Sequence, residues 1–489
     1  MKRPLLSAMS ACLLAALPSF AQTNLLQKAN DLELKGDFKE AGALLSKALE
    51  TKSLDPAQKK QLEFDLDRLD RIKKDFPFTK DSLYDALKIS VKDLTPAEYD
   101  QWVKQGRFDS REIDGTRYFM GDSVRNLFFR YTELLARRTP PKSLSSDAQA
   151  RWESCFNIRK AAMVQGKPYV LPKKFQVTMT VTAEADAAPA GQTIRAWIPV
   201  PRRYPFQEGF EVVASSPQVK QLDSEDSPIR SAYFEQVTEK DKPTEFKIEY
   251  NYTAYGVFFD IKPAEVRPCD PNDPALAPYL REVPHIQFSP EIRALSQKIV
   301  GNETNAYRKA KKCYDWIADN INYSYAIEYS TIRNISEYCR SRGYGDCGQE
   351  ALLFMTLCRL NGVPARWQSG WNTFPGVKSN HDWSEIYLAP YGWIPVDPYM
   401  GIFSMRYATN LRPEQQKEMR DFYFGGLDQY RMIANSDHSV DLRPTKQSIR
   451  SDDVDFQRGE LECNGKNIYL DKFSYSLTYR EIKPPQKVD

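Results

Sequence analysis

The heptapeptide Tyr344–Glu350, with the sequence YGDCGQE, leads directly into the apolar stretch Ala351–Leu357, ALLFMTL. The apolar stretch predicts a buried helix, and Asp346 is placed to act as its N-cap residue. Cys347 then stands at the helix N-terminus, where unpaired N–H groups and the positive end of the helix dipole favour thiolate over thiol. The sequence therefore predicts a reactive cysteine at this helix start.

Two further signals follow the helix in order. Residues 380–383, NHDW, lead into a predicted strand at 384–388, and after a turn a second strand is predicted at 393–398, WIPVDP. If these strands pair as a hairpin, the return strand brings Asp397 level with residues near 383 and next to His381. Cysteine, histidine and aspartate in this order are the nucleophile, general base and orienting group of a catalytic triad. We therefore predict Cys347, His381 and Asp397 as the catalytic residues.

Each of these residues also has an ordinary structural interpretation. A cysteine at a helix start is commonly a small buried apolar residue. A single histidine is commonly structural, and an aspartate before proline commonly ends a strand in a turn. The three residues together, in this order and on suitable elements, favour the triad.

Four separated blocks of the chain resemble the transglutaminase-like superfamily, in its bacterial secreted branch. The blocks are GDCG at 345–348, NGVPAR at 361–366, HDWSE at 381–385 and WIPVDP at 393–398. The resemblance covers about residues 285–405 and implies a papain-like α+β fold, with Cys347 as nucleophile, His381 as base and Asp397 as orienter. It does not decide the reaction, because the superfamily includes transamidases, peptidases, amidases and proteins whose substrate is unknown.

The composition favours an exported protein with several domains. The 489 residues include 68 basic and 65 acidic side chains, a balance that points to neither nucleic acid nor an anionic membrane as partner. Lys2-Arg3, an apolar segment and a small-residue site at 19–21 are typical of a signal peptide spanning 1–21. Lipoprotein processing at Cys12 is the alternative, and the apolar residues after Cys12 disfavour it. With no later membrane span, we expect a periplasmic or extracellular protein.

Seven cysteines remain after the predicted cleavage, an odd number that leaves at least one free thiol. They are Cys155, Cys269, Cys313, Cys339, Cys347, Cys358 and Cys463. Their spacing shows no disulfide framework, and Cys358 is expected to pack within the apolar helix. Because the three histidines are far apart and no CxxC occurs, we expect no metal site and no cofactor.

The rest of the chain divides by its apolar periodicity. A mostly helical domain is predicted at 22–165, opening with a tetratricopeptide-type (TPR-like) helix pair at 24–50. Further helices are predicted at 57–75, 82–105 and 121–137, with a strand- or loop-like piece at 111–119. An antiparallel β-sandwich is predicted at 170–262, the catalytic core at 285–405 and a C-terminal β-rich extension at 406–489. The predicted fold class is therefore multidomain α+β.

The expected chemistry is thiol acyl transfer on an amide. The Cys347 thiolate attacks the carbonyl carbon, the Cys347 backbone N–H helps to bind the oxyanion, and His381 protonates the departing amine. Tyr323 and Tyr325 are candidates for a second oxyanion donor, with core packing as the alternative role. Hydrolysis is preferred over transamidation because water is present at about 55 M and no docking site for an acyl-accepting amine is visible.

The sequence leaves the substrate open among peptides, proteins and the stem peptides of peptidoglycan. Two other functions also stay open: a cross-linking protein-glutamine transamidase and a non-catalytic binding protein with the same fold. The helical domain is a candidate surface for a protein partner.

Overall fold

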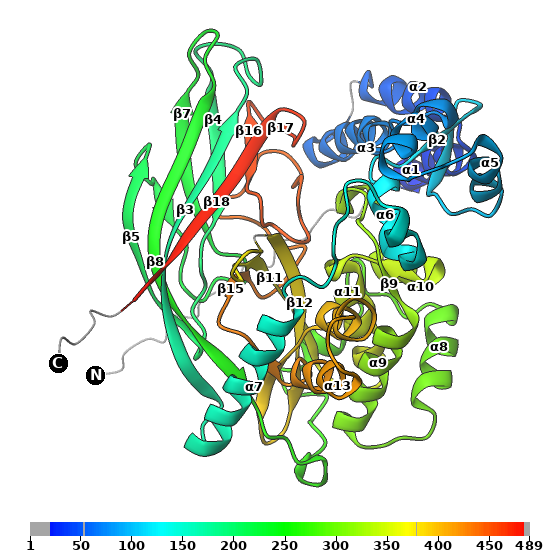
Figure 1. Cartoon of the computed structure of the whole chain (residues 1–489). Helices are drawn as coiled ribbons and strands as arrows, with labels where there is room; N and C mark the ends of the chain where they lie inside the picture. Colours follow the sequence, from blue (N-terminus) through cyan, green and yellow to red (C-terminus); the bar gives the residue numbers. More distant parts are fainter. Residues whose placement is uncertain (1–19, 52–53, 378, 484–489) are drawn as a thin grey trace, which may run out of the picture.

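The computed structural model describes residues 20–51, 54–377 and 379–483. Except for residues 20 and 21, the signal peptide expected at 1–21 lies outside the described residues, and so does Cys12. Figure 1 shows helices at the upper right, a second group of helices at the lower right and two β-sheets on the left. Among the described helices, none is long and apolar enough to cross a membrane.

The N-terminal region consists mainly of helices, and side chains cap the starts of three of them. Asp55, Thr79 and Thr95 accept backbone N–H groups at the starts of α3, α4 and α5. The elements are α1 (Phe20–Lys35), α2 (Phe38–Leu49), α3 (Pro56–Asp75), α4 (Lys80–Ser90), α5 (Pro96–Lys104), β1 (Ser110–Ile113), β2 (Thr116–Phe119), α6 (Ser123–Arg130), the 3-10 helix η1 (Thr132–Arg137) and α7 (Ala148–Gln165).

Two of the predicted helices in this region are each divided. The helix expected at 82–105 is interrupted because Thr95 caps a new helix that begins at Pro96. The helix expected at 121–137 ends at Arg130 and is followed by η1. Helix α7 contacts β3, β8 and α13, so its side chains reach the centre of the molecule.

Two antiparallel sheets make up the left side of Figure 1. One has the order β14-β8-β3-β18 with β5 on β8, and the other has the order β17-β16-β4-β7-β6. Their apolar side chains form one shared cluster, to which Val177, Ile198 and Phe234 belong. The strands are β3 (Tyr169–Ala183), β4 (Thr193–Pro199), β5 (Gln207–Ser216), β6 (Gln221–Leu222), β7 (Ser231–Val237), β8 (Thr244–Phe258), β14 (Gly426–Leu427), β16 (Glu460–Cys463), β17 (Lys466–Ile468) and β18 (Phe473–Ile482).

The C-terminal segment completes both sheets. Strand β18 pairs with β3 along its whole length, from Phe473 opposite Ala183 to Ile482 opposite Lys174. Strand β16 pairs with β4 in the other sheet. The chain end therefore joins strands that lie about three hundred residues earlier, a long-range pairing that local patterns do not predict.

The remaining elements form a layer of helices on a four-stranded antiparallel sheet with the order β13-β12-β11-β15. Helix α11 lies at the centre, with residues 348–359 all buried. The elements are η2 (Pro263–Glu265), η3 (Ala277–Leu280), α8 (Pro290–Val300), α9 (Ala306–Asn320), β9 (Asn322–Tyr323), η4 (Tyr329–Thr331), α10 (Ile335–Arg342), β10 (Tyr344–Gly345), α11 (Cys347–Leu360), β11 (Ala365–Asn372), β12 (Ser379–Leu388), β13 (Gly392–Val396), α12 (Pro398–Ile402), the π-helical turn η5 (Phe403–Tyr407), α13 (Pro413–Phe422) and β15 (Arg431–Asn435).

Gly370 allows the edge strand β15 to close on β11. A Cβ atom at this position would lie 1.8 Å from the carbonyl oxygen of Met432, so no other residue fits without moving the strand. Strand β15 begins with Arg431, and the close approach brings this side chain into the interior beside the candidate site.

Candidate active site

Cys347 occupies the first position of α11, as the sequence predicts. Asp346 is the N-cap residue, and its Oδ1 accepts a hydrogen bond from the backbone N–H of Gln349 at 3.2 Å. The hydroxyl group of Tyr329 donates to the same carboxylate. Burial raises the pKa of Asp346 to about 6, although these hydrogen bonds oppose the shift. A carboxylate that caps the helix thus lies beside the cysteine.

His381 and Asp397 meet through the predicted β12–β13 hairpin. Val396 pairs with Ser384, which places Asp397 beside Trp383. The Nε2 atom of His381 lies 2.8 Å from Oδ2 of Asp397, and both side chains are buried. This contact leaves Nδ1 as the ring nitrogen that can take part in a reaction with the cysteine.

Aromatic packing holds the histidine ring in place. Trp383 stacks on His381 with ring centroids 5.4 Å apart, and Tyr399 contacts the ring edge-on at the same separation. The indole Nε1–H of Trp383 donates to Oε1 of Gln368 at 2.5 Å. Because Trp383 is fully buried and hydrogen-bonded, it supports His381 rather than forming a wall for substrate.

Arg431 is a site residue that the sequence analysis missed. Its Nη2 atom lies 3.0 Å from Oδ2 of Asp397 and 3.2 Å from Oδ2 of Asp428. Burial acts to raise the pKa of Asp397, but the charges of His381 and Arg431 more than offset it, and the pKa is lowered. The carboxylate therefore stays ionised and can stabilise an imidazolium. The only signal in the sequence is a charged residue at the start of an apolar strand, which by itself resembles a surface residue.

The surroundings of Cys347 correct the expectation of a thiolate. Its Sγ atom lies 3.4 Å from Oδ2 of Asp382, as a hydrogen-bond donor. Burial raises the pKa of Cys347 well above its usual value, and the charges of Asp382 and Asp346 raise it further. The helix dipole contributes about 0.3–1 kcal/mol, which is too little to overcome burial and two carboxylates. The expected lowering of the thiol pKa is therefore wrong for this arrangement.

Asp382 is held in turn by a residue from the C-terminal segment. Gln457 donates through Nε2 to Oδ1 of Asp382 at 2.5 Å and to the carbonyl oxygen of His381 at 2.8 Å. One amide thus fixes the backbone of the histidine and the carboxylate beside the cysteine. The sequence analysis gave Asp382 no role in the preferred triad.

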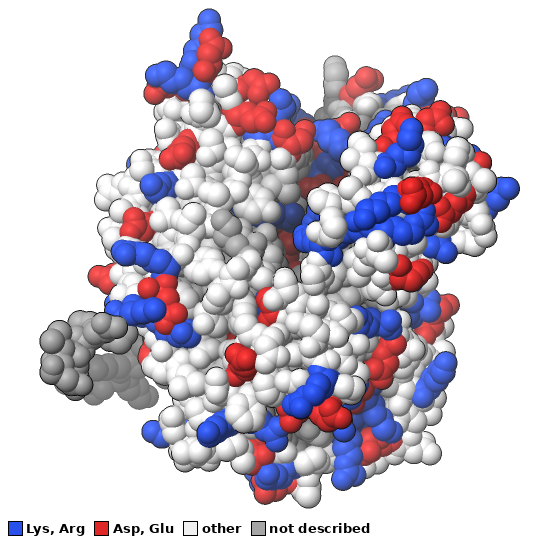
Figure 2. All heavy atoms as spheres, in the orientation of Figure 1, with Lys and Arg blue, Asp and Glu red and all other residues white. Residues whose placement is uncertain are grey.

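Cys347 and His381 line the same cavity, which has a volume of about 710 Å³. Asp397 does not line it and lies behind His381. Tyr323 and Tyr325 also line the cavity, and Tyr323 packs against Phe129 and Tyr399. The position of Tyr323 is compatible with a role as second oxyanion donor and with a role in core packing. Figure 2 shows the molecule hollowed between the sheets and the N-terminal helices, with basic and acidic side chains inside the hollow.

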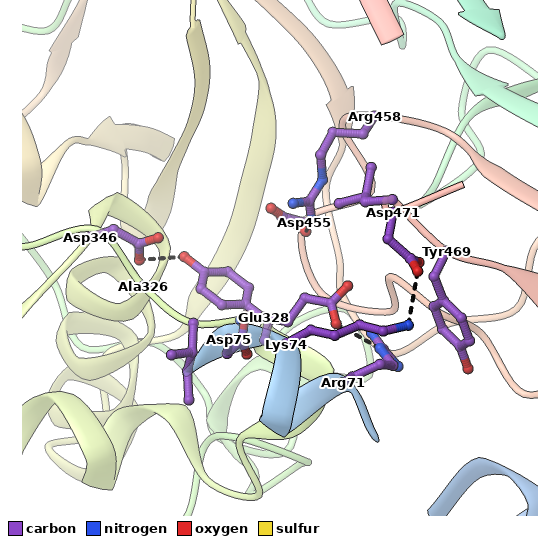
Figure 3. Close-up of a pocket in the computed structure, with 13 residues that line it drawn as sticks. Arg71, Lys74, Asp75, Ala326, Glu328, Asp346, Asp455, Arg458, Tyr469 and Asp471 are labelled. Atoms are coloured by element: carbon purple, nitrogen blue, oxygen red, sulfur yellow. Dashed lines mark hydrogen bonds and ion pairs between the residues drawn. The ribbon is translucent and has the colours of Figure 1, made fainter. Parts of the chain in front are cut away.

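A second cavity, of about 320 Å³, adjoins the first. Figure 3 shows it between α3 and the 455–471 segment, with Asp346, Asp455 and Arg458 shared between the two cavities. In its wall Arg71 pairs with Glu328 at 2.6 Å and Lys74 pairs with Asp471 at 2.8 Å. The cleft at Cys347 therefore continues toward the helical region along a charged wall.

The seven cysteines of the described residues are all free. Within the same residues, no three histidine, cysteine, aspartate or glutamate side chains are grouped so that they could hold a metal ion.

The segment that carries these residues has a family match. Residues 293–398 match the model of the transglutaminase-like superfamily, and Cys347, His381 and Asp397 lie inside it. The segment 293–398 therefore belongs to the transglutaminase-like superfamily. In the transglutaminase-like core, the helix with the cysteine packs on the sheet that carries the histidine.

The chain also resembles individual proteins at low identity. An uncharacterized protein of Haemophilus influenzae is 22% identical over 230 residues, which are 42% of this chain and 62% of that protein. The uncharacterized protein YebA of Bacillus subtilis is 24% identical over 129 residues, which are 22% of this chain and 17% of YebA. The chain thus spans less than two thirds of either relative.

Among solved structures, a "Putative Cysteine Protease" from Cytophaga hutchinsonii is 17% identical, with a TM-score of 0.43 over 65% of this chain and 93% of that one. The periplasmic domain of TgpA from Pseudomonas aeruginosa is 14% identical, with a TM-score of 0.26 over 47% of this chain and 96% of that domain.

Proposed function

We propose that the protein is a thiol enzyme that cleaves amide bonds in peptides through Cys347, His381 and Asp397. The observation that carries the proposal is the arrangement of His381. Its Nε2 is held at 2.8 Å by a buried, ionised Asp397, while the ring lines the cavity that also contains Cys347. A histidine oriented in this way, in the same cavity as a cysteine, is the arrangement that nucleophilic catalysis uses.

In the proposed reaction His381 takes the thiol proton at Nδ1, and the Cys347 sulfur attacks the carbonyl carbon. For this step the sulfur turns from Asp382 toward His381, by rotation about the Cα–Cβ bond of Cys347. Asp346 already binds the N–H group of Gln349, so the N–H groups of Cys347 and Gly348 at the start of α11 are the ones left for the developing oxyanion. His381 then protonates the departing amine, and the acyl group remains on sulfur as a thioester.

Water completes the proposed cycle. It adds to the thioester carbonyl with His381 as base, and the sulfur leaves as the acid product is released. The cavity is lined by the carboxylates of Asp346, Asp382 and Asp455, a polar wall that admits water beside the sulfur. We therefore favour hydrolysis over transfer to an amine.

The proposal includes a location and a substrate class. Export through the signal peptide at 1–21 would place the enzyme in the periplasm or outside the cell, with peptides, proteins or peptidoglycan stem peptides as substrates. The division into a TPR-like helical domain, a β-sandwich, a core and a C-terminal extension belongs to the same proposal, with the helical domain as a surface for a protein partner.

The test is turnover of a peptide library and of purified wall fragments by the protein, with product masses as the readout. We expect cleavage that is lost in Cys347→Ala and His381→Ala while both variants keep the wild-type melting temperature. Cys269→Ala is the matched control, because this partly exposed cysteine lies outside the cavity and should be dispensable.

Two outcomes would change the proposal. Products that contain an added amine, when a primary amine is present, would establish transamidation instead of hydrolysis. Turnover that survives Cys347→Ala would remove the thiol mechanism altogether.

A further inference from the structure

Arg151 is a buried cation in the wall of the cavity that contains Cys347 and His381. It comes from α7, outside the transglutaminase-like core, and is only 3% exposed. Its Nε donates to Asp147, one turn earlier in the chain. The guanidinium carbon lies 4.3 Å from the ring centroid of Phe374 and 5.9 Å from that of Phe403.

The guanidinium of Arg151 is only partly hydrogen-bonded. Nη1 is buried and has no hydrogen-bond partner among the residues that the structure describes. A buried polar group without a partner costs about 1–3 kcal/mol, and more when it is charged. Arg151 therefore pairs with one carboxylate, Asp147, and keeps Nη1 without a partner among the described residues.

The charge on Arg151 is permanent. Burial opposes it, but Tyr423 and Asp147 more than offset the burial, so the pKa of Arg151 is raised. An arginine side chain presents a planar fork of N–H groups that matches a carboxylate in two hydrogen bonds. A cavity of about 710 Å³ has room for a peptide segment beside it.

The position of Arg151 indicates which part of a substrate it meets. Its guanidinium carbon lies 5.9 Å from the ring centroid of Phe403, which lies 6.3 Å from that of Tyr399, the tyrosine in contact with the His381 ring. The Cys347 thiol instead contacts Asp382, whose Oδ2 lies 3.4 Å from Sγ. Since His381 protonates the departing amine, Arg151 belongs to the leaving-amine side of the site.

We propose that Arg151 binds a carboxylate of the substrate on the leaving-amine side of the scissile amide. This inference rests on the proposed function and narrows it. The preferred substrates are peptides in which the residue after the scissile bond carries a carboxylate, either the free C-terminal carboxylate or an acidic side chain.

The first experiment measures binding to the full chain carrying Cys347→Ala, so that no turnover occurs. Calorimetry compares three probes: acetyl-Ala-Ala-Ala with a free carboxylate, the same peptide as its carboxamide, and acetyl-Ala-Ala-Asp carboxamide. We expect the free acid to bind about tenfold more tightly than the carboxamide, because one charge-assisted hydrogen bond changes the dissociation constant by about this factor. Tight binding of the aspartyl probe would extend the preference to acidic side chains.

Arg151→Met should abolish the preference, and Arg151→Lys should restore part of it. Arg159→Met is the matched control, because Arg159 lies two turns further along α7 and does not line the cavity. Equal binding of acid and carboxamide by a protein with wild-type Arg151, or a preference that survives Arg151→Met, would overturn the inference.

A second measurement decides the case in which none of the probes binds. In the chain with native Cys347, mass spectrometry gives the ratio of Cys347 alkylation rates by iodoacetate and by iodoacetamide. Arg151→Met should lower this ratio several-fold, while Arg159→Met leaves it unchanged; an unchanged ratio in folded Arg151→Met refutes the inference. Failure of the proposed function is distinguishable, because it appears as turnover that does not depend on Cys347.

Discussion

The Sγ atom of Cys347 lies 3.4 Å from Oδ2 of Asp382 and donates a hydrogen bond to it. Asp382 follows His381 directly in β12, at the end of the strand where both residues line the cavity. The thiol of the candidate nucleophile is therefore held as a proton donor by the neighbour of its candidate base. Activation must transfer the thiol proton to His381 and turn the sulfur away from Asp382. This arrangement therefore differs from a preformed thiolate–imidazolium pair.

Asp382→Asn should make Cys347 more reactive toward iodoacetamide at neutral pH. The substitution removes the acidic group whose charge raises the pKa of Cys347, so this pKa falls and the thiolate fraction rises by about tenfold for each unit. Alkylation rates at pH 7, followed by intact mass, check this. Asp441→Asn, at an exposed carboxylate that lines none of the cavities described above, is the control. A rate equal to or below that of the wild type would contradict the inhibitory role of Asp382.

Cys347 and Cys269 should be the thiols that react first in the folded protein. The other five cysteines of the described residues are buried, whereas Cys347 and Cys269 are partly exposed. Mass-spectrometric mapping after brief alkylation gives the order. Faster labelling of Cys313 or Cys339 than of Cys347 would show that the native protein does not expose the cavity in this way.

Asp397→Asn should leave partial activity, with a loss of about 10²- to 10⁴-fold in kcat. The amide keeps an acceptor for the backbone N–H of Met400, which Oδ1 of Asp397 now binds at 3.0 Å, but it no longer stabilises an imidazolium. Comparison of kcat with that of His381→Ala tests the division of roles. Wild-type activity in Asp397→Asn would move the orienting role elsewhere, first to Asp382.

Asp75 should make the stability depend on pH between about 4 and 7. Burial, and then the charge of Glu328, raises the pKa of Asp75 to about 7 from its usual value of 3.8. The folded state thus holds a proton that the unfolded state has released. This contribution to stability is complete below the unfolded pKa and is lost as pH rises through 7.

Urea unfolding from pH 4 to 8 measures the effect. Relative to the wild type, Asp75→Asn should gain stability as the pH is raised, because the amide needs no proton. Asp70→Asn, at an exposed position of the same helix, should not change the slope. A constant difference between wild type and Asp75→Asn at every pH would show that the carboxyl does not titrate in this range.

Activity should survive EDTA and respond to thiol oxidants and reductants. A calcium site needs six or more oxygen ligands, and the acidic residues near the core are not arranged in a loop of alternating ligands. Assay of the peptide cleavage after dialysis against EDTA, with and without added calcium, is the test. Loss on chelation that calcium restores would revive the cross-linking transamidase.

The sequence predicted the local elements of the site well. Asp346 caps the helix, and the hairpin brings Asp397 level with Trp383 and next to His381, as expected. Each of these depends on residues close together in the chain, where capping, turn chemistry and strand alternation act directly. The division of the helices at 82–105 and 121–137 was missed, because apolar periodicity does not reveal a new helix start inside a periodic stretch.

Only the tertiary structure decided what surrounds the cysteine and the triad. Asp382, 35 residues from Cys347, raises the thiol pKa; Arg431 pairs with Asp397 from another strand; and Arg151 enters the cavity from α7. The sequence alone shows these residues as ordinary charges. Their effect arises because folding removes water around them, and the resulting electrostatic energies depend on distances between atoms that local pattern does not specify.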